Sequence, residues 1–315
     1  MVDEKIVEYS KNAYKKFGIS QFKILKTTGQ GNFLVGMGNK DDRRYLIKIA
    51  NKADSSQLNK ISLEIANMNF LDRTIHGSKF YTSVIGSWDD DDYKWLLREY
   101  IEGGSLSLYQ DSDEVLMGYD SLSSEYLNRG DEITGAVVEK VYDLQAISDF
   151  LDYKFAPQRF WSSFSDDDGL KLLDIHQLDA RPALDYFSKH RVDYFAAKKI
   201  KISNCDLVPS NIIVSKDGRV YLTDFEWMTL DNYMMDFAQL WLYLWRYQNW
   251  QQSLLKKAIK SDADKENFRL SVVRAVLTFL LTATTAKKVQ YYKNHLWRKY
   301  LIAASESFES LMNIK

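Results

Sequence analysis

The spacing of apolar residues changes along the first hundred positions. Near the N-terminus apolar residues fall at helical spacing and predict a helix that Gly18 can end: Ile6, Tyr9, Ala13, Tyr14 and Phe17. Three short segments rich in apolar or β-branched residues follow at 21–27, 33–37 and 44–50, with a polar turn at 38–42. These segments predict a three-stranded meander. A helix is expected over 57–71, and two more strands over 80–88 and 93–101.

After Gly103-Gly104 the pattern becomes mainly helical. Apolar spacing predicts helices over 137–150, 182–197, 233–251 and 268–288, and a strand–turn–strand unit over 211–223. The sequence therefore predicts an α+β protein of two lobes. Residues 1–102 form a small β-rich N-terminal lobe, and residues 103–315 form a larger helical lobe that would carry the chemistry.

The composition limits the class of protein. The 315 residues include 45% hydrophobic residues, enough for a sizeable core, and carry a formal charge of -1, which argues against a protein that coats nucleic acid. A single cysteine, Cys205, excludes a disulfide framework, and the four scattered histidines show no zinc-site spacing. The longest apolar stretch, 272–283, contains Arg274 and is too short to span a bilayer. We expect a soluble, cytoplasmic protein, whose oligomeric state the sequence leaves open.

A glycine-rich loop and a lysine mark a candidate phosphate site. Gly29 and Gly31 lie between the first two predicted strands, where backbone N–H groups can approach phosphate oxygens, although any tight turn uses the same residues. Lys48 interrupts an otherwise apolar strand. It either faces solvent or is a partly buried cation that needs an anionic partner. Glu64, on the next predicted helix, is either that partner or an exposed helical glutamate.

The most informative stretch runs from Asp206 to Asp224. Asn211 follows Asp206 by five positions, and Asp224 follows Asn211 by thirteen, across a hairpin with Asp-Gly at its turn. A hairpin brings its ends together, so two carboxylates and an amide oxygen can converge on one cleft. Mg²⁺ prefers such oxygen ligands. The alternative, that each residue only caps a turn, explains one of them well and all three together poorly.

This region resembles the aminoglycoside phosphotransferase and choline kinase family, which has a protein-kinase-like fold. The family pattern is His-Gly-Asp, four residues, Asn, and then an Ile-Asp-Phe/Trp-Glu type motif. This chain has Asn204-Cys205-Asp206, Asn211 and Thr223-Asp224-Phe225-Glu226. The glycine loop, the Lys48 strand, the Glu64 helix and a hinge-like segment at 96–104 fall in the expected order. The resemblance extends from about residue 22 to about residue 243.

The resemblance implies a role for each of these positions. Asp206 would orient the attacking hydroxyl, Asn211 and Asp224 would bind Mg²⁺, and Lys48, held by Glu64, would neutralise phosphate charge of ATP. Gly29 and Gly31 would cover the phosphates, and backbone groups near Glu99 and Ile101 would hydrogen-bond the adenine. Asp236, near the start of a later helix, would brace the catalytic loop.

Three positions depart from the family pattern. Asn204 stands in place of the histidine that braces the loop, and an asparagine can also hydrogen-bond the backbone. Cys205 replaces the neighbouring glycine, and we interpret it as a packed side chain. Arg98 falls near a position that usually lines the adenine pocket with an apolar side chain.

The expected activity is ATP- and Mg²⁺-dependent phosphoryl transfer to a hydroxyl of a small molecule, such as an amino alcohol, aminoglycoside or sugar. From Glu99 to Asp206 there are 107 positions, enough for added helices that wall off a pocket. Only 12 positions separate Asp224 from Asp236, too few for the long activation segment of a protein kinase. Acidic residues in the insertion, among them Asp111, Asp113 and Glu114, would suit a cationic acceptor. The alternatives are a nucleotide-binding pseudokinase or scaffold and, less favoured, a protein kinase.

Overall fold

The computed structural model describes residues 2–26, 33–75, 80–107, 122–150, 166–176, 180–283 and 289–290. Gly29, Gly31 and the acidic residues Asp111, Asp113 and Glu114 lie outside this range. The chain forms two compact units. The first, which we call the sheet unit, comprises Met1–Gly103 and Thr223–Met228; the second, the helical unit, comprises Gly104–Leu222 and Thr229–Lys315. The chain therefore returns to the sheet unit for the few residues around Asp224.

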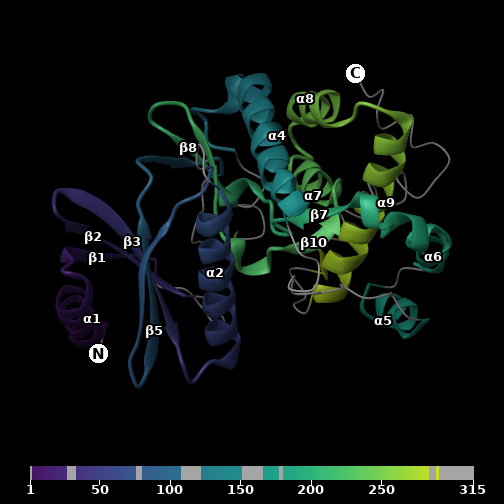
Figure 1. The fold of residues 1–315 in the computed structure, drawn as a ribbon. Coiled ribbons are helices and arrows are strands. Elements are labelled where there is room, and N and C mark those ends of the chain that lie inside the picture. Colours follow the sequence, from purple (N-terminus) through teal and green to yellow (C-terminus); the bar gives the residue numbers. More distant parts are fainter. Residues whose placement is uncertain are drawn as a thin grey trace. The chain divides into compact units, whose positions relative to one another are not determined.

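The sheet unit is built on one antiparallel five-stranded sheet in the order β1-β2-β3-β5-β4 (Figure 1). Its strands are β1 (Ser20–Lys26), β2 (Leu34–Lys40), β3 (Arg43–Asn51), β4 (Val84–Asp89) and β5 (Tyr93–Glu99). The predicted meander is confirmed by the pairing of β1 with β2 and of β2 with β3. The strand predicted over 80–88 begins only at Val84, because Phe80 and Tyr81 turn into the core, where the Tyr81 ring packs edge-on against Phe225.

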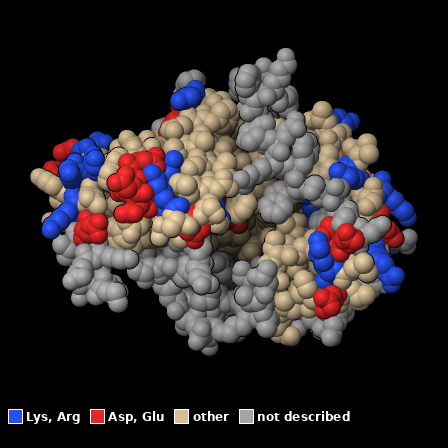
Figure 2. Space-filling view, turned by 90° about the horizontal axis from the view of Figure 1, so that it is seen from below, with Lys and Arg blue, Asp and Glu red and all other residues tan. Residues whose placement is uncertain are grey.

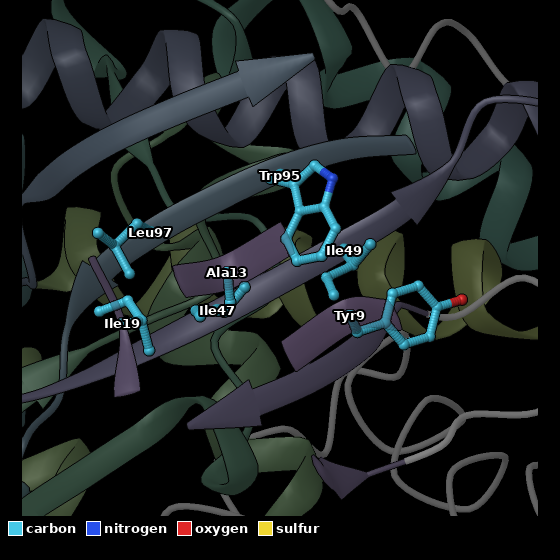
Figure 3. Packing of buried hydrophobic residues seen from close by; sticks show 7 residues of the cluster. All are labelled: Tyr9, Ala13, Ile19, Ile47, Ile49, Trp95 and Leu97. Atoms are coloured by element: carbon cyan, nitrogen blue, oxygen red, sulfur yellow. The ribbon is translucent and has the colours of Figure 1, made fainter. Parts of the chain in front are cut away.

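Alternation along β3 and β5 gives the sheet two different faces. Ile47, Ile49, Trp95 and Leu97 pack with Tyr9 and Ala13 of helix α1 (Val2–Phe17), as Figure 3 shows. Ala50 and Leu96, whose side chains point to the other face of the sheet, pack instead with Ile61 and Ile65 of helix α2 (Ser55–Thr74). Successive side chains of a strand point to opposite faces, so Lys48, two residues from Ala50, faces α2 rather than α1.

Helix α2 begins where the sequence places a capping residue. Asp54 accepts hydrogen bonds from the backbone N–H groups of Ser56 (3.0 Å) and Gln57 (3.1 Å), which the first turn of a helix leaves without partners. From that start, Glu64 lies in the buried middle of the helix. The cap thus sets which helical positions face the sheet.

The helical unit contains six described helices and two small sheets. The helices are α4 (Gly130–Ala146), α5 (Asp166–His176), α6 (Arg181–Tyr194), α7 (Met235–Tyr243), α8 (Gln248–Ala258) and α9 (Asp262–Thr282). Strand β7 (Ile200–Ser203) pairs with β10 (Thr229–Asn232), and β6 (Gly103–Ser105), β8 (Ile212–Ser215) and β9 (Val220–Leu222) form the other sheet. Short 3-10 helices lie at η1 (Leu127–Arg129), η2 (Ile147–Phe150), η3 (Ala197–Lys199), η4 (Pro209–Asn211) and, in the sheet unit, η5 (Phe225–Trp227). The hairpin predicted over 211–223 is confirmed by β8 and β9, with Gly218 at positive φ in its turn.

Three helix predictions need correction. The helix predicted over 233–251 is two helices, α7 and α8, the helix predicted over 137–150 already begins at Gly130, and the helix predicted over 268–288 already begins at Asp262. The first two differences meet at one contact, since a Cβ atom on Gly130 would lie 2.9 Å from the indole Nε1 of Trp250. Because α8 turns away from α7, Trp250 can pack on the glycine at the start of α4. Tertiary packing overrides the helix propensity of residues 244–247 and the helix-weakening glycine.

Charged side chains of both signs lie on the surface of the described residues. On the face shown in Figure 2, lysine and arginine residues lie beside aspartate and glutamate residues rather than in separate patches of one sign. Of the helices in the described ranges, none combines the length and the apolar character needed to cross a bilayer.

Candidate active site

Lys48 is the centre of a buried ion cluster in the sheet unit. Its Nζ lies 2.6 Å from Glu64 Oε2, 2.6 Å from Asp224 Oδ1 and 4.0 Å from Glu226 Oε2. The side chain of Lys48 is 7% exposed and that of Glu64 is fully buried, so the alternatives of a solvent-facing lysine and an exposed glutamate are wrong. The predicted Lys48–Glu64 pair is present.

Asp224 and Glu226 enter this cluster through a short, unusual segment. Asp224 adopts a left-handed conformation (φ 61°, ψ 65°), uncommon for a residue other than glycine, and η5 starts directly after it. The amide of Asn67 on α2 donates a hydrogen bond to the backbone carbonyl of Phe225 (2.7 Å). The strained turn is therefore held against α2, and it aims the Asp224 carboxylate at Lys48.

Lys60 holds the other end of the segment. Its Nζ lies 3.1 Å from Glu226 Oε1 and 5.3 Å from the centre of the Trp227 ring. Trp227 thus has a cation of the same chain on its face. One lysine of α2 fixes two consecutive residues of the segment.

The pKa values of the two carboxylates in this segment are shifted in opposite directions. Burial alone would raise the pKa of Asp224, but Lys48 outweighs it and holds that pKa below its usual range. Burial and the neighbouring Asp224 raise the pKa of Glu226, despite Lys48 and Lys60. The pKa of Lys48 is raised because Asp224 and Glu64 outweigh the opposing effect of its burial. Lys48 and Asp224 are therefore an ionised pair at neutral pH.

Three carboxylates of the cluster fit a divalent cation. One oxygen each of Glu64, Asp224 and Glu226 lie within 4.8 Å of one another. Glu226 Oε2 is buried without a hydrogen-bond partner, which is costly unless a cation or a donor arrives. Hard carboxylate oxygens are the donors that Mg²⁺ prefers. The donor set thus suits Mg²⁺, with Asp224 the most accessible of the three at 30% side-chain exposure.

A second cation binds Glu64. Arg98 Nη1 lies 3.3 Å from Glu64 Oε1, while Lys48 takes Oε2. The sequence placed Arg98 near the adenine pocket, but it gave no sign of a contact with Glu64. The available signal was the charged residue at the end of the apolar run Trp95-Leu96-Leu97, the same kind of signal that marked Lys48.

In the helical unit, the loop after β7 carries Asp206 and Asn211. The Asn211 amide donates to the backbone carbonyl of Asp206 (2.8 Å) and to its Oδ2 (3.0 Å). The Oδ1 atom of Asn204 accepts the backbone N–H of Asp206 (3.1 Å). Asn204 therefore does brace the loop, as the sequence suggests an asparagine can in place of the family histidine.

The buried carboxylate of Asp236, in the first turn of α7, holds the start of this loop. It accepts hydrogen bonds from the Ser203 hydroxyl (2.6 Å) and from the backbone N–H groups of Asn204 (2.9 Å) and Cys205 (3.0 Å). Burial raises the pKa of Asp236 to about 6, with these hydrogen bonds opposing the shift. The bracing role expected for Asp236 is confirmed.

A buried ion pair lies behind the loop. Arg274 Nη1 of α9 lies 2.6 Å from Asp231 Oδ2 of β10, and both side chains are 2% exposed. The thiol of Cys205 lies 3.8 Å from the same Asp231 oxygen, and burial, followed by Asp231 and Asp236, raises the pKa of that thiol. Cys205 is thus a packed thiol and not a thiolate nucleophile, although its φ of 58° is one that glycine adopts more readily.

The remaining predicted residues are placed as follows. Glu99 ends β5, and its backbone N–H donates to Ser83 O (3.4 Å); Ile101 follows two residues later. Their contact with adenine, and a shared metal between Asn211 and Asp224, remain predictions. Lys60, Arg98 and Glu226 are charged residues of the cluster that the sequence did not assign to it.

Comparisons with known proteins bear on the fold. No protein-family model matches the chain, and no curated protein matches its sequence. A mutant aminoglycoside 2'-phosphotransferase-IIIa in complex with GDP has a TM-score of 0.63 at 13% identity, covering 97% of this chain and 99% of that chain. A thermostable mutant of aminoglycoside phosphotransferase APH(4)-Ia has a TM-score of 0.60 at 14% identity, covering 94% of this chain and 99% of that chain. A choline/ethanolamine kinase family protein from Mesorhizobium loti has a TM-score of 0.59 at 13% identity, covering 99% of this chain and 97% of that chain.

These solved structures share the architecture of the whole chain at low sequence identity. The chain therefore has the α+β, protein-kinase-like fold of the aminoglycoside phosphotransferases, as the sequence resemblance predicts. A shared fold does not by itself fix the reaction, so the activity has to be argued from the residues.

Proposed function

We propose that this chain is a small-molecule kinase that uses ATP and Mg²⁺ to phosphorylate a hydroxyl group. The observation that carries the proposal is the buried cluster in which Lys48 contacts both Glu64 and Asp224 at 2.6 Å. A buried lysine that is held charged by two carboxylates costs free energy to maintain. The cluster is suited to neutralise the charge of a transferring phosphoryl group.

Each residue has a physical role in this proposal. Lys48, oriented by Glu64, would neutralise α- and β-phosphate charge. Asp224, with Asn211 from the loop after β7, would hold Mg²⁺, and Glu226 is a further candidate because its buried Oε2 has no hydrogen-bond partner. Bound Mg²⁺ would supply charge neutralisation at the β- and γ-phosphates. The backbone near Glu99 and Ile101 and the loop with Gly29 and Gly31 would bind the base and the phosphates.

Asp206 would act on the acceptor. Its side chain receives a hydrogen bond from Asn211, and its backbone N–H is held by Asn204, so the carboxylate has a fixed position. A carboxylate held in this way can orient the acceptor hydroxyl and accept its proton as the oxygen attacks the γ-phosphorus. The similar structures include an aminoglycoside phosphotransferase and a choline/ethanolamine kinase family protein, which supports a small acceptor with a cationic group.

The test is an ADP-release assay with MgATP over amino alcohols, aminoglycosides, sugars and nucleosides, run in parallel with casein and histone. We expect turnover with one small-molecule class and none with the proteins. Asp224→Asn should abolish the Mg²⁺-dependent part of nucleotide affinity measured by calorimetry. Asp217→Asn, an exposed aspartate of the β8–β9 turn, is the matched control and should leave both measurements unchanged.

Two results would redirect the proposal. Nucleotide binding without turnover of any acceptor would favour the pseudokinase alternative. Labelling of proteins without metabolite turnover would favour a protein kinase.

A further inference from the structure

Arg98 is a charged residue in an apolar part of the sheet unit. It follows Leu97 on β5, and its cross-strand neighbours are Leu46 on β3 and Val84 on β4. Because Leu97 packs with the cluster on the α1 side, alternation turns Arg98 toward α2, the face that carries Lys48. Its side chain is only 11% exposed. Burying a guanidinium at this position is costly unless an anion compensates for it.

The compensating anion is Glu64, which also serves Lys48. Arg98 Nη1 lies 3.3 Å from Oε1, and Lys48 Nζ lies 2.6 Å from Oε2. Each oxygen of this fully buried carboxylate therefore has its own cation. A carboxylate held at both oxygens has a fixed orientation, whereas one held at a single oxygen can rotate.

The charges of the cluster balance among the residues that the structure describes. Arg98, Lys48 and Lys60 supply three positive charges, and Glu64, Asp224 and Glu226 supply three negative charges. Lys48 is shared between two carboxylates, so when it turns toward a phosphate its contacts with them weaken. Arg98 contacts the other oxygen, Glu64 Oε1, so the carboxylate keeps one of its two cation partners.

We infer that Arg98 is a positioning residue for Lys48, acting through Glu64. The inference rests on the proposed function for its catalytic consequence, but the contact itself can be tested without nucleotide. Arg98 fixes the carboxylate from which Lys48 reaches the phosphates. It therefore affects nucleotide use without touching the acceptor.

The kinetic test is a double-mutant cycle with Arg98→Met and Glu64→Gln. Arg98→Met should lower kcat/KM for the nucleotide by about tenfold, mainly through KM, because Lys48 meets the phosphates in the ground state as well as in the transition state. In the Glu64→Gln background, where the charge shared by both cations is gone, the same substitution should cost less than threefold. Arg98→Lys should restore more than half of the lost activity. Arg44→Met, which removes an exposed Arg–Glu pair of the same sheet, is the control and should have no effect.

The second test uses the nucleotide-free protein. Urea unfolding of the wild type, the variants Arg98→Met and Glu64→Gln, and the double variant should show a coupling between Arg98 and Glu64 of about tenfold in the unfolding equilibrium constant. Coupling without any phosphoryl transfer by the wild type would defeat the proposed function and leave the Arg98–Glu64 contact standing. Additive effects in unfolding, or equal kinetic losses in both backgrounds of an active enzyme, would overturn the inference.

Discussion

The two units hold their functional residues in different ways. In the sheet unit, charged side chains contact other charged side chains, and Lys48 divides its contacts between Glu64 and Asp224. In the helical unit, the carboxylate of Asp236 accepts hydrogen bonds from two backbone N–H groups and a hydroxyl, and so fixes the path of the chain. The first arrangement can exchange partners when a ligand brings new charges. The second holds one backbone shape.

This difference matches what the proposed phosphoryl transfer would require of each region. Binding a highly charged nucleotide and a metal ion changes the local charge, so ion pairs there have to be able to rearrange. Orienting an acceptor hydroxyl requires a carboxylate at a constant position. We therefore expect substitutions in the sheet unit to change nucleotide and metal binding, and substitutions in the helical unit to change kcat and stability.

The largest effect is expected at Asp206. Asp206→Asn keeps the size of the side chain but removes the charge that accepts a proton, and should lower kcat by roughly 10²–10⁴. Nucleotide affinity should stay within about threefold, since the nucleotide contacts assigned above lie elsewhere. Steady-state ADP release and calorimetry measure the two quantities. A loss confined to nucleotide affinity would contradict the separation of roles between the units.

The next largest effect is on stability, at the buried pair Arg274–Asp231. Arg274→Met leaves Asp231 as a buried, uncompensated carboxylate and should lower the free energy of unfolding by about 3–5 kcal/mol. Arg219→Met removes an Arg–Asp pair in which both side chains are more than half exposed, and should cost less than about 1 kcal/mol. Urea unfolding compares the two variants. Equal costs would mean that the pair behind the loop that carries Asp206 behaves like a surface pair.

The third prediction concerns pH and Asp236. Its pKa is about 6 in the folded protein against 3.8 ordinarily, so the folded state retains this proton to higher pH than the unfolded chain does. The stability that this carboxyl contributes is therefore greatest below pH 3.8 and is lost as the pH rises through 6. The loss is about 3 kcal/mol at 1.4 kcal/mol per pKa unit.

Asp236→Asn isolates this contribution, because other titrating groups are common to both proteins. Relative to the variant, the wild type should lose about 3 kcal/mol of unfolding free energy between pH 4 and pH 7, measured by urea unfolding at a series of pH values. Parallel pH profiles for the two proteins would show that Asp236 has an ordinary pKa.

The sequence predicted those parts of the molecule that local patterns determine. The meander, the helix expected over 57–71 and the β8–β9 hairpin follow from apolar alternation, helical spacing and an Asp-Gly turn, all within short windows. The Lys48–Glu64 pair could be predicted because a lysine in an apolar strand needs an anion. These features required no knowledge of distant residues.

What the sequence did not predict depends on contacts between distant segments. The break between α7 and α8 contains neither proline nor glycine, and it goes with the packing of Trp250 on the distant Gly130. Glu226 and Arg98 are also ordinary charged residues until the fold brings them to Lys48 and Glu64. Strands β7 and β10, of four residues each, are too short for a periodic pattern to show.

The smallest effect is expected at Asn204, where the family pattern has a histidine. Its Oδ1 accepts the backbone N–H of Asp206 at 3.1 Å, a single neutral hydrogen bond worth about 1 kcal/mol. Asn204→Ala should therefore lower kcat by about fivefold, by loosening the position of Asp206, while nucleotide affinity stays unchanged. Asn204→Asp keeps an acceptor oxygen at the same place and should retain more activity than Asn204→Ala, although it adds a charge near Asp206. The kcat values of the wild type, Asn204→Ala and Asn204→Asp test this prediction. If alanine were as active as asparagine, the Asn204 hydrogen bond would contribute nothing to the position of Asp206, and that position would come from the other contacts of the loop, among them those of Asp236, Gln239 and Asn211.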